Sequence, residues 1–155
     1  MLDEPFMVIL GDNVVSEDVG RFVRDFQNER DRFKAKILVA KVKDPEKYGV
    51  VEFEGKKIVN IVEKPKNPVS SYVNTGLWMF LPDVFELLRN LKKSPRGEYE
   101  VTDVLSCYAK EGVLSYSILK SPWTDAGSFE SLYNATVLMK KLEDREQAVS
   151  VKRDT

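Results

Sequence analysis

The chain has 155 residues, a length typical of one domain, and 43% of them are hydrophobic, which excludes a disordered or collagen-like chain. Lysine and arginine total 24 against 25 acidic residues, a balance that gives no electrostatic footprint for nucleic acid or an anionic membrane. There is no histidine and only one cysteine, Cys107, so histidine catalysis, histidine-ligated zinc and an internal disulfide are excluded.

The longest apolar runs, at residues 6–10 and 77–81, are far shorter than the ~20 residues that span a bilayer. The chain begins with acidic residues that lead into a strand-like run, so no signal peptide is visible. We therefore expect a cytoplasmic protein that binds neither membranes nor nucleic acid.

The first third of the chain predicts a strand and then a helix. Residues 6–10 are uniformly apolar, which is typical of a strand buried on both faces in the parallel part of an α/β sheet. A helix follows with apolar residues at helical spacing, and Ser16 is a suitable N-cap for it. The apolar positions of this helix are Val19, Phe22, Val23 and Phe26.

Strands dominate the prediction for the middle of the chain. Residues 36–42 predict a strand, and residues 48–54 and 57–63 predict a hairpin that turns at Gly55. A further strand is predicted at residues 73–81, with Gly76 interrupting it.

Helices and one more strand complete the predicted order. Pro82 suits the first turn of a helix. A second helix is predicted by the helical spacing of Val101, Val104, Leu105 and Tyr108, and Gly112 is a suitable stop for it. Residues 113–119 predict a strand, and Ser128 is a suitable cap for a last helix. The whole chain is therefore one α/β unit with a mixed strand order.

Polar motifs follow or interrupt the predicted strands at four places. They are residues 11–13 (Gly-Asp-Asn), 63–65 (Glu-Lys-Pro), 74–76 (Asn-Thr-Gly) and 123–127 (Trp-Thr-Asp-Ala-Gly). Ligands of open α/β sheets bind at the carboxyl ends of strands, where Asp12 and Asp125 would together suit Mg²⁺ and a lysine would suit a phosphate. Each motif alone is more typical of an ordinary turn or a solvated ion pair.

The order of the motifs along the chain is more specific than any single motif. The series G-D-N, Y-G-V, E-K-P, N-T-G, R-G-E-x-x-x-T-D and W-x-D-x-G, spread over residues 3–142, resembles the sugar-1-phosphate nucleotidyltransferases, and glucose-1-phosphate thymidylyltransferases in particular. The resemblance implies a Rossmann-like nucleotide-diphospho-sugar transferase fold, a truncated mixed sheet flanked by helices. It places one domain at residues 1–142, and we expect a charged, frayed tail at residues 143–155.

The resemblance also implies a reaction and its residues. A sugar-phosphate oxygen attacks the α-phosphate of a nucleoside triphosphate and pyrophosphate leaves. Asp12 and Asp125 match the Mg²⁺-binding aspartates, whereas Lys64 and Arg96 match catalytic residues that contact phosphate. The matching substrate-binding positions are Tyr48, Gly49, Glu63, Asn74, Thr75, Gly76 and Trp123.

Two of these positions leave alternatives open. Asn74 stands where thymidylyltransferases commonly have valine, and Asn-x-Gly is similar to related uridylyl and guanylyl enzymes, so the base and the sugar stay undecided. Trp123 either stacks on the ligand or belongs to the core.

Family members also have a Gly-rich loop, G-x-G-T-R-L, that grips the triphosphate, and no segment of this sequence has that form. The chain thus resembles the sugar- and metal-binding half of a family member, and we expect little or no nucleotidyl transfer from it alone. We expect it to associate with a second copy or with a complementing N-terminal half.

Two other functions stay open on the sequence alone. A non-catalytic module that binds a sugar-phosphate or a sugar-nucleotide, for example a regulatory one, would keep the same pocket. A metal-dependent glycosyltransferase of similar architecture is disfavoured, because neither Asp12 nor Asp44 has a second aspartate two residues away.

Overall fold

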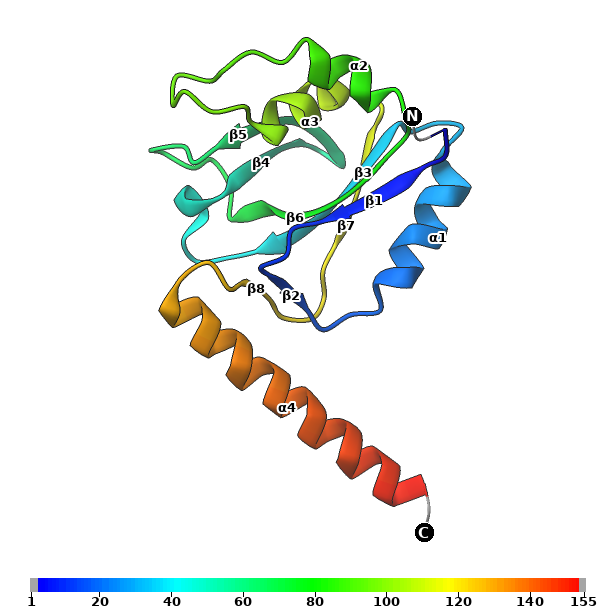
Figure 1. The fold of residues 1–155 in the computed structure, drawn as a ribbon, viewed down its shortest axis with the longest axis vertical. Coiled ribbons are helices and arrows are strands. Elements are labelled where there is room, and N and C mark those ends of the chain that lie inside the picture. Colours follow the sequence, from blue (N-terminus) through cyan, green and yellow to red (C-terminus); the bar gives the residue numbers. More distant parts are fainter. Residues whose placement is uncertain (1–2, 154–155) are drawn as a thin grey trace.

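The computed structural model describes the backbone of residues 3–153 and the side chains of residues 3–144 (Figure 1). Its centre is a mixed sheet in the order β5-β4-β6-β3-β7, in which β1 also pairs with β6. The strands are β1 (Phe6–Ile9), β3 (Ala35–Lys41), β4 (Gly49–Glu54), β5 (Lys57–Glu63), β6 (Tyr72–Phe80) and β7 (Leu114–Ile118). Together with its flanking helices, this sheet confirms the expected α/β fold.

Strand β1 lies in a different environment from the one we expected. It runs antiparallel to β6, with Phe6 opposite Phe80 and Ile9 opposite Leu77. Ile9 is 52% exposed, and β6 is the only strand that pairs with β1 in the described part of the chain. The prediction of a parallel, fully buried strand was wrong, because an apolar run does not determine the direction or number of its neighbours.

Helices cover both faces of the sheet. Helix α1 (Val19–Glu29) packs Phe22 and Phe26 against Leu38, Leu77 and Met79 on one face. The opposite face is covered by α2 (Val84–Arg89) and α3 (Val101–Lys110), whose buried residues include Val84, Val104, Leu105 and Tyr108. The sheet core is therefore apolar on both sides and holds the polar motifs at fixed positions on its rim.

The N-cap of α1 is Asp18 and not Ser16. Asp18 Oδ1 accepts a hydrogen bond of 2.8 Å from the Gly20 N–H, as an N-cap does. Ser16 lies two residues before the cap position, and its hydroxyl donates to the Pro122 carbonyl at 3.2 Å instead.

The middle of β6 is irregular where residues 74–76 lie. The pairing with β3 shifts between Ile37 and Val39, and the Thr75 hydroxyl donates to the Leu38 carbonyl at 2.8 Å inside this irregularity. Gly76 has φ +75°, a conformation that side-chain-bearing residues rarely adopt. A Cβ there would lie 2.9 Å from Leu10 Cδ1, so glycine also lets the chain after β1 lie against β6.

A second, two-stranded sheet carries two of the motifs. In it β2 (Asn13–Val15) pairs antiparallel with β8 (Trp123–Asp125), so Asn13 lies opposite Asp125. This pairing joins segments more than 100 residues apart in the chain and was not among the predicted elements.

The chain ends in α4 (Phe129–Arg153), which projects from the body of the molecule (Figure 1). Ser128 caps this helix as expected, since its Oγ accepts a 3.1 Å hydrogen bond from the Ser131 N–H. The described backbone is helical to Arg153. The expectation of a frayed tail from residue 143 stays a prediction. No helix in the described part of the chain combines the length and the apolar character needed to cross a membrane.

Candidate functional site

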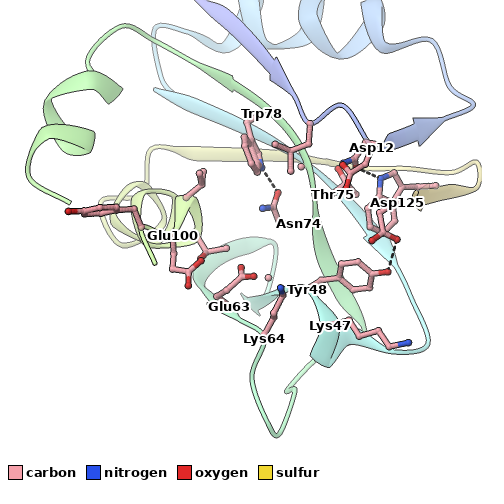
Figure 2. Close-up of a pocket in the computed structure, with 18 residues that line it drawn as sticks. Asp12, Lys47, Tyr48, Glu63, Lys64, Asn74, Thr75, Trp78, Glu100 and Asp125 are labelled. Atoms are coloured by element: carbon pink, nitrogen blue, oxygen red, sulfur yellow. Dashed lines mark hydrogen bonds between the residues drawn. The ribbon is translucent and has the colours of Figure 1, made fainter. Parts of the chain in front are cut away.

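A pocket of about 360 Å³ opens between the small sheet, the middle of β6 and the start of α3 (Figure 2). Ten of the eleven residues that the motifs predict for the site line this pocket. They are Asp12, Tyr48, Gly49, Glu63, Lys64, Asn74, Thr75, Gly76, Trp123 and Asp125. The structure thus brings residues of five separate motifs into one cavity.

Asp12 and Asp125 lie beside each other at one end of the pocket (Figure 2). The pairing of β2 with β8 fixes this, and the Ala126 N–H donates to the Asp12 carbonyl at 2.7 Å. A Cβ on Gly127 would lie 3.4 Å from Asp125 Oδ2 and 3.6 Å from Asp12 Oδ2. The absence of a side chain at Gly127 therefore leaves an open space that both carboxylates border.

Two aromatic residues brace this acidic end. The Tyr48 hydroxyl donates to Asp125 Oδ1 at 3.1 Å, and the Trp123 indole N–H donates to Asn13 Oδ1 at 2.6 Å. The two rings meet edge to face, with their centroids 5.4 Å apart. Burial, followed by the negative charge of Asp125, raises the pKa of Tyr48 to about 12. Tyr48 is therefore a neutral donor at neutral pH.

The wall formed by β6 presents Asn74 to the cavity. Asn74 is 8% exposed, and its Oδ1 accepts a hydrogen bond of 2.7 Å from the Trp78 indole N–H. Since an indole N–H can only donate, it fixes the orientation of the amide. The Asn74 amide nitrogen is left as a potential donor to a bound molecule.

Glu63 and Lys64, at the end of β5, border the pocket opposite the aspartates (Figure 2). Lys64 has φ 42°, the one positive φ outside glycine in the described chain, and its N–H donates to the Tyr48 carbonyl at 2.9 Å. A left-handed residue with a side chain costs about 1–2 kcal/mol, and such strain clusters at functional sites. The strand end thus directs neighbouring acidic and basic side chains toward one cavity.

The Glu63 carboxylate lies among other charges. Burial, followed by repulsion from Glu100, raises the pKa of Glu63 above its ordinary value, while the positive charges of Lys64 and Arg96 oppose the rise. Glu63 Oε2 also lies 3.2 Å from the position that a Cβ on Gly49 would occupy. Gly49 therefore allows this carboxylate to lie close to the β4 backbone.

Arg96 is the one predicted site residue that does not line the pocket. Its guanidinium lies 3.2 Å from Glu100 Oε1, 3.3 Å from Glu98 Oε2 and 3.7 Å from Glu63 Oε1. Two of these carboxylates, those of Glu63 and Glu100, face the pocket. In this structure Arg96 acts on the pocket wall by neutralising and holding those two carboxylates.

The motif analysis missed several residues that complete the wall. They are Leu10, Asn13, Lys47, Trp78, Tyr99, Glu100, Val101 and Thr102. Thr102 is a specified position of the R-G-E-x-x-x-T-D motif, which therefore contained its signal, whereas Glu100 stands at an unspecified position of that motif. The signal for Trp78 was weaker, because an aromatic residue in a buried strand is usually part of the core.

The donor set at Asp12 and Asp125 suits Mg²⁺, which takes oxygen ligands and usually binds through one or two carboxylates plus phosphates and water. Neither aspartate forms an ion pair with a described residue. In the described part of the chain no group of three or more histidine, cysteine, aspartate or glutamate residues could hold a metal. A cation between Asp12 and Asp125 would therefore need further ligands from a bound phosphate and from water.

Comparison with known proteins defines the class of this site. The sequence profile of the family described as nucleotidyl transferase matches residues 1–141, and the chain therefore belongs to that family.

Individual curated proteins within this family are similar to the chain. The chain is 38% identical over 141 residues to the glucose-1-phosphate thymidylyltransferase of Mycolicibacterium smegmatis, an alignment that covers 88% of this chain and 48% of that protein. It is 35% identical over 127 residues to the bifunctional protein GlmU of Methanocaldococcus jannaschii. That alignment covers 81% of this chain and 29% of the relative. The chain thus spans about half the length, or less, of these curated relatives.

Solved structures show the same fold. A crystal structure of a Bacillus anthracis protein assigned as a glucose-1-phosphate thymidylyltransferase, in complex with a sucrose, superposes with a TM-score of 0.80 at 43% identity. The match covers 88% of this chain and 55% of that one. A UDP-glucose pyrophosphorylase complexed with UDP-glucose superposes with a TM-score of 0.77 at 28% identity.

Proposed function

We propose that the chain supplies the sugar-phosphate and metal half of a nucleotidyl-transfer site of the glucose-1-phosphate thymidylyltransferase kind. The observation that carries the proposal is one pocket with two aspartates at one end, which form no ion pair with a described residue, and the Glu63–Lys64 pair at the other. Such a cavity offers oxygen ligands for a cation, a positive charge for a phosphate and acceptors for hydroxyl groups.

In the proposed reaction a sugar-1-phosphate oxygen attacks the α-phosphate of a nucleoside triphosphate, and pyrophosphate leaves. Asp12 and Asp125 would hold Mg²⁺, which when bound neutralises charge on the phosphates. Lys64 would bind the sugar-phosphate as a point charge. Glu63 would accept hydrogen bonds from sugar hydroxyls, and Tyr48 would keep Asp125 oriented.

Further residues would shape the sugar pocket. We assign Asn74 as a donor to a sugar oxygen, while Gly49, Thr75 and Gly76 would let the backbone approach the ligand closely. Trp123 would bound the ligand at the metal end. The assignment of Arg96 to a phosphate stays a prediction, and its present contacts support a role in positioning Glu63. The base and the sugar are not assigned.

We further propose that this chain alone transfers little or no nucleotide, because positioning the triphosphate provides much of the catalysis in phosphoryl transfer. Two features support a missing neighbour. Strand β1 pairs only with β6 in the described part of the chain, and a groove of about 210 Å³ between β1, β6 and helices α2 and α3 is lined only by apolar residues. They are Phe6, Val8, Trp78, Phe80, Val84, Phe85, Leu88, Val101 and Val104. Association with a second copy or with a complementing N-terminal half would cover this edge.

The alternative is a non-catalytic module that binds a sugar-phosphate or a sugar-nucleotide, for example as a regulator. The half-length match to curated relatives favours it as much as it favours a half-enzyme.

The test is an assay of pyrophosphate release. The purified chain is incubated with Mg²⁺, ribo- and deoxyribonucleoside triphosphates and a panel of sugar-1-phosphates, alone and with the N-terminal half of the Mycolicibacterium smegmatis relative. We expect release only in the mixture, and its loss in Asp12→Asn but not in Asp25→Asn, a remote exposed aspartate of α1.

Turnover by the chain alone would overturn the half-enzyme proposal. Saturable binding of a nucleotide-sugar, without turnover by the chain alone or with the N-terminal half, would support the binding module. No binding and no turnover from a folded chain would overturn both.

A further inference from the structure

A second pocket, of about 580 Å³, lies at the opposite end of β5 from Glu63 and shares no residue with the candidate site. We call it the basal pocket. It is lined by Glu29, Arg32 and Phe33 after α1, Lys56–Val59 at the start of β5, Ala109, Lys110 and Gly112 at the end of α3, and Leu114–Tyr116 in β7.

Positive charge dominates the lining of the basal pocket. Arg32, Lys56, Lys57 and Lys110 are all exposed, and in the described part of the chain none of the four forms an ion pair. The one acidic residue in the lining is Glu29, whose Oε2 lies 3.0 Å from the Nζ of the buried Lys36. Glu29 therefore does not neutralise the other four cations, which converge on one cavity and repel one another.

Helix capping does not explain this charge. Basic side chains often stabilise the free carbonyls of a helix C-terminus, and both α1 and α3 end here. Backbone groups already cap both ends, however. The N–H groups of Arg32 and Phe33 donate to the Glu29 carbonyl at 2.9 Å, and the Gly112 and Val113 N–H groups donate to carbonyls of α3 at 3.0 Å. The four cations are free to act on a bound molecule.

The floor of the basal pocket is apolar and aromatic. Phe33, Ile58, Leu114 and Tyr116 line it, and the Arg32 guanidinium lies 5.0 Å from the centroid of the Phe33 ring. Stacking on the ring restrains Arg32 without using its N–H donors. A cationic rim around an apolar floor suits a molecule with several negative charges on a small organic body.

We propose that the basal pocket binds a small molecule that carries two or more phosphate groups, at a site separate from the candidate catalytic pocket. The phosphates would neutralise Arg32, Lys56, Lys57 and Lys110, and the organic part would lie on Phe33. This proposal goes beyond the proposed function and does not depend on it.

Isothermal titration calorimetry with inorganic tripolyphosphate in EDTA tests the proposal. The Lys64→Ala background removes the lysine that we expect to bind phosphate in the candidate site. In this background we expect saturable binding that weakens at least tenfold in Lys57→Glu/Lys110→Glu. A matched control, Lys92→Glu/Lys141→Glu, changes the net charge equally at exposed positions outside the pocket and should bind as the background does. Circular dichroism checks that each variant is folded.

A nucleoside triphosphate in the same titration distinguishes two sources of affinity. Tighter binding than tripolyphosphate, with the difference lost in Phe33→Ala, would place an organic body on the floor. Equal binding would assign the affinity to the phosphates alone and would still support the site. The proposal is overturned if tripolyphosphate does not bind, if both double variants lose affinity equally, or if Lys64→Ala alone abolishes binding.

Discussion

The two ends of the candidate site both contain a pair of carboxylates, but they are built differently. Asp12 lies on a loop and is exposed, whereas Asp125 ends the three-residue strand β8 and is half-exposed. Neither forms an ion pair with a cation among the described residues. Glu63 and Glu100 lie on the main sheet and at the start of α3, and Arg96 contacts both. The first pair therefore has negative charge available for a cation, whereas the charge of the second is partly neutralised by Arg96, and this pair suits uncharged hydroxyl groups.

The largest effect is expected when a carboxylate is removed from the acidic end, which should weaken metal binding. With a sugar-1-phosphate present to supply the phosphate ligand, we expect Asp125→Ala to weaken the binding of Mn²⁺, used as a spectroscopic substitute for Mg²⁺, by more than about 100-fold. Even residues that only orient a metal ligand contribute about 10–100-fold to affinity, and Asp125 would be a ligand itself. Electron paramagnetic resonance of free Mn²⁺ measures the change. Asp25→Ala is the control, and equal binding by the two variants would contradict the metal assignment.

At the other end, Gly49→Ala tests how tightly the sugar side is packed. A Cβ at Gly49 would lie 2.7 Å from Thr102 Cγ2, a contact that both β4 and α3 would have to relieve by moving. We expect a loss of about 1–3 kcal/mol in the free energy of unfolding, as for other overpacked sites. Urea unfolding measures it. Gly11→Ala, where no atom lies within 4 Å of the new Cβ, should change stability by less than about 0.5 kcal/mol.

The difference between the two ends also shows what sequence could and could not predict. Strand-like apolar segments predicted β3 and the β4–β5 hairpin, and helical spacing predicted α1 and α3, each of which buries one face. The β2–β8 sheet has three-residue strands, which are too short to show a period. Asp12 was therefore related to Asp125 by its place after a predicted strand and by the joint motif order, not by a predicted strand pair. The ion pairs at the Glu63 end depend on which side chains meet after folding, so the contacts of Arg96 with Glu63 and Glu100 could not be predicted from the sequence.

A smaller effect is expected when the neutralising cation at the Glu63 end is removed. In Arg96→Gln, Glu63 and Glu100 would repel each other without compensation, and we expect a loss of about 1–2 kcal/mol at pH 7, between the values for surface and buried ion pairs. The loss should depend on pH. Glu63 already has a pKa raised above 4.5, so its protonated form is favoured by folding, and stability falls as pH rises from about 4.5 through the raised pKa.

Because Arg96 opposes that rise, its removal raises the pKa of Glu63 further. The loss in free energy of unfolding in Arg96→Gln should therefore be larger above the pKa of Glu63 than below it. Urea unfolding at pH 4 and pH 7 should therefore show a smaller deficit at pH 4. Arg24→Gln removes an exposed ion pair with Asp18 and should show less than about 0.5 kcal/mol at either pH. A deficit for Arg96→Gln that is the same at both pH values would contradict a role in holding the carboxylates.

The smallest effect concerns Tyr48, which links the two ends through its hydroxyl on Asp125 and its carbonyl on Lys64. Burial is the first cause of its pKa of about 12, and the charge of Asp125 is the second. Asp125→Asn should therefore lower the pKa of Tyr48 without returning it to 10, because the burial remains. Absorbance titration at alkaline pH, with Tyr48→Phe identifying the signal, measures the shift. If Asp125→Asn leaves the pKa unchanged, the hydroxyl does not depend on the aspartate charge, and Tyr48 orients Asp125 only by packing.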